Sequence, residues 1–231
     1  MDHTATAFEQ ELKDIAVKIG RMGERAGGEL DDALDAILRC DASLAADVIA
    51  SDKLLDGEEA EVERKAIRVI ALRQPVADDL RRLISAMKIS ANLERCGDLA
   101  KNIAKRSRVM APDVCARFPL DGIERLGRLV GSRLAEVVEA YIARDLEAAV
   151  QVWSRDAEID TAHEGLAREL LGAMGLKGAD MEAGMHLLFV AKNLERIGDH
   201  ATNIAELIHY ELTGTDIEGA RPKHDPLNDP A

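Results

Sequence analysis

The sequence holds few of the residues that build sheets or disulfide frameworks. Of its 231 residues, three are cysteine and six are proline, and the aromatic share is 3%. Ala, Leu, Glu, Arg and Asp are abundant instead, and this composition favours long helices over sheets. Prolines are rare before residue 222, so long stretches of the chain contain no helix breaker.

The three cysteines are Cys40, Cys96 and Cys115. They are odd in number and form no Cys-x-x-Cys pair, so neither a disulfide framework nor a zinc ribbon is indicated. We expect reduced thiols that fill space in the core, as in a cytoplasmic protein.

Long apolar runs are missing as well. No window approaches 18 uncharged apolar residues, so no membrane-spanning helix is expected. The first residues, MDHTATAFEQELKDI, contain neither the basic nor the apolar region of a signal peptide. We therefore expect a cytoplasmic protein that reaches a membrane only through its partners.

Positive charge is in short supply, and the net charge is −13. An acidic surface repels nucleic acid and anionic membranes, so neither is an expected ligand, whereas cations and basic partner surfaces are suited to it. The sequence contains no Gly-rich phosphate loop, no Gly-x-Ser-x-Gly and no Cys/His zinc spacing. No nucleophile or base is grouped with its acids, so we expect a protein that is not an enzyme.

Apolar residues recur at helical spacing between sparse, regularly placed breakers. The pattern predicts six long helices, at about 6–40, 43–73, 76–110, 120–144, 146–174 and 180–212. The fold class is therefore all-α, as two pseudo-symmetric three-helix bundles. The predicted domains are 1–111 and 119–213, followed by a polar, Pro-containing tail at 214–231 that we expect to be disordered.

The two halves of the chain are repeats of each other. Residues 92–104 read NLERCGDLAKNIA and residues 193–205 read NLERIGDHATNIA, so ten of thirteen positions are identical. The second helix of each half also matches, at an offset of 104 residues. Gly97 and Gly198 lie inside these helices at a cost of about 1 kcal/mol each, which indicates a close approach of neighbouring helices.

The repeated phrase places two carboxylates one helical turn apart, on nearly the opposite face from its apolar stripe. Oxygens at that spacing can share one cation, and like charges there are mildly destabilising without one. The alternative is a solvated acidic face. The candidate metal ligands on the third helix of each half are Glu94, Asp98, Glu195 and Asp199, with Asn102 and Asn203 as additional candidates.

The second helix of each half carries a further pair of acids beside its apolar stripe. An acid in such a stripe needs either an Arg or a metal as its partner, so a salt bridge between helices is the alternative to a metal site. These candidates are Asp52, Asp56, Asp156 and Asp160, with Glu59 and His163 as additional ligands. Oxygen ligands of this kind suit Mg, Mn, Fe or Ca. Whether the acids of the second and third helices meet is left open.

The segments QPVADDLR at 74–81, KISANLERCGD at 88–98 and LERIGD at 194–199 resemble the PhoU family, the phosphate-transport regulatory proteins of bacteria. Met22-Gly23 and Asp52-x-x-x-Asp56 fit the same pattern, and the resemblance covers about residues 5–213. The second repeat departs from the segment at 74–81, reading Lys177-Gly178 and Glu182-Ala183-Gly184 instead. A partner contact through Arg81 is therefore expected in the first repeat alone.

The resemblance implies two three-helix bundles, often in a homodimer. It implies a negative regulator of phosphate-starvation genes that links an ABC phosphate transporter ATPase to a sensor histidine kinase when phosphate is ample. It also implies that the Glu/Asp-x-x-x-Asp motifs can hold multinuclear metal clusters on the bundle surface. The alternatives are a metal-storage or metal-sensing helical protein and, less in keeping with the missing catalytic groups, a metal-dependent enzyme.

Overall fold

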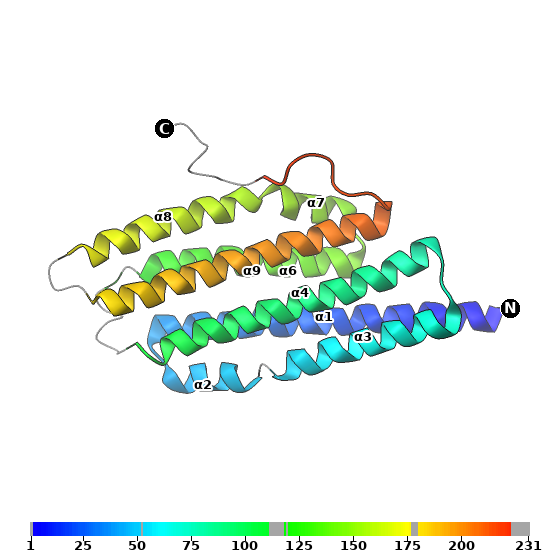
Figure 1. The fold of residues 1–231 in the computed structure, drawn as a ribbon, viewed down its shortest axis with the longest axis horizontal. Helices are drawn as coiled ribbons and strands as arrows, with labels where there is room; N and C mark the ends of the chain where they lie inside the picture. Colours follow the sequence, from blue (N-terminus) through cyan, green and yellow to red (C-terminus); the bar gives the residue numbers. More distant parts are fainter. Residues whose placement is uncertain (1, 52, 111–117, 119, 177–179, 223–231) are drawn as a thin grey trace.

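A computed structural model describes residues 2–51, 53–110, 118, 120–176 and 180–222 of the chain. Every regular element in this part is an α-helix (Figure 1), which confirms the predicted fold class. None of the described helices is long and apolar enough to cross a membrane. The elements are α1 (Asp2–Arg39), α2 (Ala42–Ser51), α3 (Lys53–Arg73), α4 (Ala77–Ser107), α6 (Leu120–Ala143), α7 (Leu146–Ser154), α8 (Asp156–Met174) and α9 (Met181–Thr213).

The second predicted helix of each repeat is divided into two segments. The predicted helix 146–174 breaks at Arg155, which has φ −102 and ψ 14, and the helix 43–73 ends and restarts on either side of residue 52. The Ser51 and Ser154 hydroxyls at the ends of the first segments donate to backbone carbonyls three residues earlier, both at 2.9 Å. Such bonds compete with helix continuation. The apolar stripe continues across each break, so periodicity could not show it.

The two repeats share one hydrophobic core. Helices α1, α4, α9 and α6 form a closed ring, in which each packs against the next and α6 packs against α1. Helices α2 and α3 cover one side of this ring, and α7 and α8 cover the other (Figure 1). Buried side chains from both repeats, such as Met22 and Leu126, belong to one continuous cluster. The repeats are therefore two halves of one packed body.

Glycines allow the helices to approach closely. A Cβ atom on Gly97 would lie 2.4 Å from Leu55 Cδ1, and one on Gly198 would lie 2.7 Å from Ile159 Cδ1. These distances are shorter than any van der Waals contact allows, so the predicted close approach is confirmed. It brings α3 onto α4 and α8 onto α9, beside the acids of the repeated phrase.

Glycines also set the contact between the first helices of the two repeats. A Cβ on Gly23 in α1 would lie 2.5 Å from Val138 Cγ1 in α6, and a Cβ on Gly127 in α6 would lie 2.5 Å from Leu34 Cδ1 in α1. Gly27, one turn after Gly23, has no atom within 4 Å of the corresponding position.

The expectation of reduced cysteines is wrong for Cys40, which is disulfide-bonded. Cys96 is a free, buried thiol in α4, as expected, and burial raises its pKa to about 12. Cys115 lies outside the described residues. Sequence spacing misled here because it does not show which cysteines meet in space.

We predict opposite effects for two Gly→Ala substitutions in α1. Gly23→Ala should lower the free energy of unfolding by about 1–3 kcal/mol, because the branched Val138 side chain cannot swing away. Gly27→Ala, with open space around it, should raise that energy by up to about 1 kcal/mol through helix propensity. Urea denaturation followed by circular dichroism measures both, and equal stability of the two variants would contradict the packing of α1 on α6.

Candidate functional site

The acids of the second and third helices of the first repeat face one another. The Glu94 side chain on α4 is 14% exposed. Burial raises its pKa to about 7, with the charges of Asp98 and, from α3, of Glu59 and Asp56 adding to the rise and that of Arg95 opposing it. The charges of Asp56 and Glu59 on α3 thus act on Glu94 of α4 across the contact between the two helices.

The neighbouring carboxylate, Asp98, is already neutralised within its own helix. Lys101 Nζ donates to Asp98 Oδ1 at 2.7 Å and Arg95 Nη1 donates to Oδ2 at 3.1 Å. Partial burial alone would raise the pKa of Asp98, but these two cations hold it below its ordinary value. Asp98 thus has two close positive partners on α4. The contact of Glu94 with Arg95 is longer, at 3.5 Å between Arg95 Nε and Glu94 Oε2.

A carboxylate from α1 joins this region, and sequence reasoning missed it. Glu29 is 5% exposed, and its Oε1 accepts a hydrogen bond from the Ser51 hydroxyl at 2.9 Å. Its Oε2 would lie 3.1 Å from a Cβ atom on Gly97, close to the centre of the repeated phrase. The sequence did contain an indication of this residue, because Glu29 is an acid inside the apolar stripe of α1. Asp52, the predicted ligand next to Ser51, lies outside the described residues.

In the second repeat, the predicted acids of α8 and α9 are joined by one arginine. Arg221 donates to both oxygens of Asp156, through Nε at 2.6 Å and Nη2 at 2.9 Å. The same Nη2 donates to Asp199 Oδ1 at 2.6 Å, and Nη1 donates to Asn203 Oδ1 at 3.3 Å. Asp156 is also the acceptor for the buried Thr202 hydroxyl, at 2.7 Å.

Arg221 belongs to the segment 214–231, which we predicted to be disordered. Residues 214–222 are described and make specific contacts, while 223–231 lie outside the described residues. A polar composition suggested disorder, but the two carboxylates of the bundle supply the fixed partners that composition does not reveal.

The remaining predicted residues of the second repeat form a separate group. Glu195 on α9 pairs with Lys192 at 2.8 Å. Burial lowers the pKa of His163 on α8, while the nearby charges of Glu195 and Asp160 oppose that effect. The charge of Glu195 on α9 therefore acts on His163 across the α8–α9 contact, and that of Asp160 acts from within α8.

The described part of the chain contains no group of three or more His, Cys, Asp or Glu side chains arranged to hold a metal ion. The predicted ligands of each helix lie on a common face of that helix. Asp52 is not among the described residues. The carboxylates of the first repeat fit a cation in donor chemistry, because such ions take carboxylate oxygens as ligands. Those of the second repeat, Asp156 and Asp199, already hold a guanidinium.

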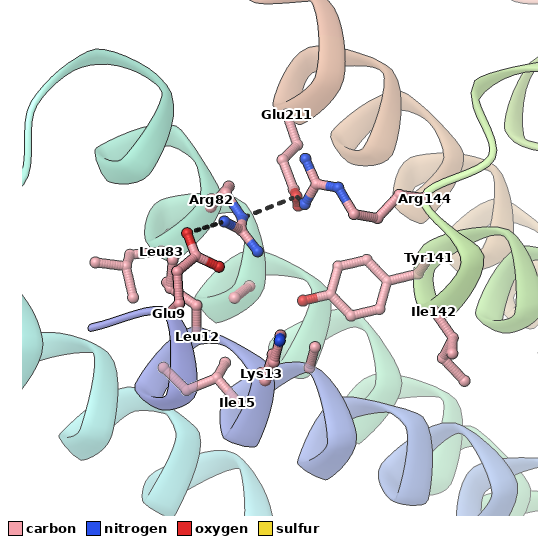
Figure 2. Close-up of a pocket in the computed structure, with 12 residues that line it drawn as sticks. Glu9, Leu12, Lys13, Ile15, Arg82, Leu83, Tyr141, Ile142, Arg144 and Glu211 are labelled. Atoms are coloured by element: carbon pink, nitrogen blue, oxygen red, sulfur yellow. Dashed lines mark hydrogen bonds and ion pairs between the residues drawn. The ribbon is translucent and has the colours of Figure 1, made fainter. Parts of the chain in front are cut away.

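A pocket of about 470 Å³ lies where α1 and α4 begin and α6 and α9 end. Figure 2 shows Glu211 of α9 between Arg82 and Arg144, with Tyr141 directed toward the space between them. Glu211 Oε1 accepts from Arg144 Nη1 at 2.6 Å, and Arg82 Nε is 3.9 Å away. Burial raises the pKa of Glu211 despite both cations. This network links the two repeats, and sequence reasoning did not find it.

Comparison with known proteins identifies the family. The model of the PhoU domain matches residues 19–107 and 123–208. The "Phosphate-specific transport system accessory protein PhoU homolog" of Caulobacter vibrioides (strain NA1000 / CB15N) is 49% identical over 227 residues, covering 98% of this chain and 99% of that protein. The chain belongs to the PhoU family. The "Phosphate-specific transport system accessory protein PhoU" of Escherichia coli (strain K12) is 33% identical, covering 93% of this chain and 89% of that protein.

Solved PhoU structures share the fold. A crystal structure of PhoU from Pseudomonas aeruginosa has a TM-score of 0.83 at 31% identity and covers 90% of this chain and 100% of that chain. The phosphate transport system regulatory protein PhoU from Streptococcus pneumoniae has a TM-score of 0.85 at 26% identity and covers 91% and 99%. The two PhoU-domain matches contain every predicted metal ligand, whereas Arg221 lies beyond both.

We predict that Glu94→Gln stabilises the protein more at pH 8 than at pH 5. The pKa of Glu94 is about 7 in the folded chain, above its ordinary value of 4.5. The unfolded chain therefore loses this proton first, and the free energy of unfolding falls as the pH rises from about 4.5 to about 7. Glutamine abolishes that fall, which should be about 1–3 kcal/mol after allowance for solvent screening.

Urea midpoints at the two pH values, measured with a chelator present, test this prediction. Glu24→Gln, at an exposed position of α1, is the control and should show no difference between the two pH values. A Glu94→Gln effect that is equal at pH 5 and pH 8 would contradict the raised pKa.

Proposed function

We propose that the protein is a cytoplasmic negative regulator of phosphate-starvation genes and phosphate uptake. In this role it acts as an adaptor between an ABC phosphate transporter ATPase and a sensor histidine kinase. The observation that carries the proposal is the similarity, over nearly the full length of both chains, to a protein named as an accessory of the phosphate-specific transport system.

The architecture supports an adaptor role. One continuous core joins both repeats, so the outer helices α2, α3, α7 and α8 form long faces on opposite sides of a single rigid body (Figure 1). Helix faces of this kind can engage two partners at once. A net charge of −13 favours basic patches on those partners. Self-association into a homodimer is part of the proposal.

We propose that the protein has no turnover of its own. Cations hold the carboxylates of Asp98, Asp156 and Asp199. Lys101 and Arg95 hold the pKa of Asp98 below its ordinary value, which makes that carboxylate a weak base. Binding is therefore the chemistry that these residues support.

We propose further that the first-repeat acids bind a divalent or trivalent cation of the Mg, Mn, Fe or Ca class. Glu94 and Asp98 on α4 would hold it, with Asp56 and Glu59 on α3 as further oxygen donors. The support is that the charges of Asp98, Glu59 and Asp56 all raise the pKa of Glu94, the latter two from across the α3–α4 contact. A bound cation would relieve their mutual repulsion.

Deletion of the gene should raise the expression of phosphate-uptake genes in high phosphate, and a plasmid copy should restore repression. The expected physical basis is a complex with the kinase and the transporter ATPase, recovered by pull-down from phosphate-replete cells. Low expression in the deletion strain, together with no recovered complex, would contradict the adaptor role. Tight stoichiometric metal binding in that case would favour the alternative, a metal-storage or metal-sensing protein.

Removal of the repeated acids should abolish most metal uptake. The variant carries Glu94→Ala, Asp98→Ala, Glu195→Ala and Asp199→Ala, and elemental analysis with Mn²⁺ titration compares it with wild type. Its matched control removes four exposed acids elsewhere, by Glu24→Ala, Asp32→Ala, Glu63→Ala and Asp216→Ala. Equal metal uptake by both variants would show that the repeated acids are not the metal ligands. Repression of phosphate-uptake genes, measured in strains that carry the same variants, shows whether bound metal is needed for regulation.

A further inference from the structure

The pocket at the end of the bundle, where α1 and α4 begin, brings together polar groups from both repeats. In the first repeat, Lys13 of α1 and Arg82 of α4 line it. In the second repeat, Tyr141 of α6, Arg144 just after that helix and Glu211 of α9 line it. Its volume of about 470 Å³ is in the range of small-molecule sites. None of these residues belongs to the carboxylate motifs considered above.

The lining of this pocket is positive, although the protein is strongly acidic. Its charged groups are three cations and two carboxylates, namely Lys13, Arg82, Arg144, Glu9 and Glu211, whereas the net charge of the chain is −13. A cleft lined by an excess of one sign of charge concentrates ions of the opposite sign. The excess of positive charge therefore favours an anion over a cation or a zwitterion as the occupant.

Glu211 supplies one hydrogen-bond acceptor that is not used within the protein. Its side chain is 5% exposed, and its Oε1 accepts from Arg144 Nη1 at 2.6 Å. Its Oε2 is buried and has no hydrogen-bond partner in the described part of the chain. A buried acceptor without a donor is costly, so a ligand that brings a donor to Oε2 removes that cost.

The other polar groups around the pocket are donors. Figure 2 shows the Tyr141 hydroxyl directed toward the space that Arg82 and Lys13 border. Burial raises the pKa of Tyr141, so its hydroxyl keeps its proton and can donate to an anion. Guanidinium groups bind phosphate oxygens through paired N–H donors, and an ammonium adds a mobile point charge. The pocket thus offers several donors and one acceptor.

Hydrogen phosphate matches this combination of donors and acceptor. Inorganic phosphate near neutral pH carries at least one hydroxyl, which donates, and further oxygens, which accept. Sulfate carries no proton, and a phosphate monoester loses its second proton above about pH 6. A site that bonds a ligand hydroxyl discriminates strongly against analogues that lack it, so the free Oε2 of Glu211 favours hydrogen phosphate.

We propose that this pocket binds hydrogen phosphate, with Arg82 and Arg144 donating to its oxygens and Glu211 Oε2 accepting from its hydroxyl. Lys13 adds a further charge and Tyr141 a further donor. A bound ion joins α1 and α4 to α6 and α9, so it stabilises the contact between the two repeats. The inference deepens the proposed function and rests on it for its meaning in the cell, because it makes the regulator itself a receptor for phosphate.

Calorimetric titration of the purified protein at pH 8 tests the choice of ligand. Sodium phosphate, sodium sulfate and glycerol 3-phosphate are added separately at equal ionic strength. We expect phosphate to bind with a Kd of about 1 mM or below. Sulfate and the monoester should bind at least about tenfold more weakly, since each loses a charge-assisted hydrogen bond. Absence of phosphate binding, or binding of either analogue as tight as that of phosphate, would overturn the inference.

Glu211→Gln separates the acceptor role of Glu211 from its charge. Loss of the negative charge should strengthen the binding of every anion. The side-chain amide can also donate, to sulfate as well as to phosphate, so the preference for phosphate over sulfate should fall below about threefold. An unchanged preference in this variant would contradict the role of Oε2.

Lys13→Gln tests the pocket without disturbing a buried ion pair, because Lys13 is exposed. It should weaken phosphate binding by about two- to fivefold. The matched control, Lys105→Gln, removes an exposed charge at the other end of α4, about 35 Å along the helix from Arg82, and should leave the affinity unchanged. Equal effects of the two substitutions would show a general response to net charge and overturn the site.

Thermal melts by circular dichroism verify that each variant is folded and provide a second readout. Phosphate should raise the Tm of the wild-type protein, and sulfate at the same ionic strength should raise it less. An equal rise with both anions would also overturn the inference. Repression of phosphate-uptake genes and recovery of partners, both measured in cells, decide the proposed function separately from these results with purified protein.

Discussion

Neutralisation of half-buried carboxylates between packed helices is the constraint on which this structure depends. Close packing at Gly97 and Gly198 brings α3 onto α4 and α8 onto α9, so acids on these helices lose solvent and approach one another. Each must then find a cation or give up its charge. Asp98 finds Lys101, Asp156 finds Arg221, and the pKa of Glu94 rises to about 7.

Both copies of the repeated phrase carry the same carboxylates, but different positive groups pair with them. A lysine at position 101 corresponds to a buried threonine at position 202, and the positive charge moves from the helix to the C-terminal segment. The two halves of the chain are thus alike in backbone and unlike in charge. The carboxylates of the two repeats therefore lie in different electrostatic environments.

Helical periodicity and the repeated phrase were enough to predict the all-α fold, the six helices and the carboxylate faces. They could not predict the break at Arg155 or the separate helices α2 and α3, because the apolar stripe continues in phase through both regions. They also could not predict contacts that join distant residues, such as those of Glu29, Arg221 and the disulfide at Cys40. Each depends on which side chains meet in space, and no local pattern records that.

The glycine contacts between α1 and α6 have a consequence for the history of the chain. Gly23 meets Val138, and Gly127 meets Leu34. At the offset of 104 residues, Gly23 corresponds to Gly127 and Leu34 corresponds to Val138. The contact of Gly127 with Leu34 is therefore the contact of Gly23 with Val138 with the two repeats exchanged. Reciprocity of this kind defines an isologous interface with a two-fold axis. The two halves join as subunits of a symmetric dimer do, which fits an origin from a three-helix protein that paired with itself before duplication fused the pair into one chain.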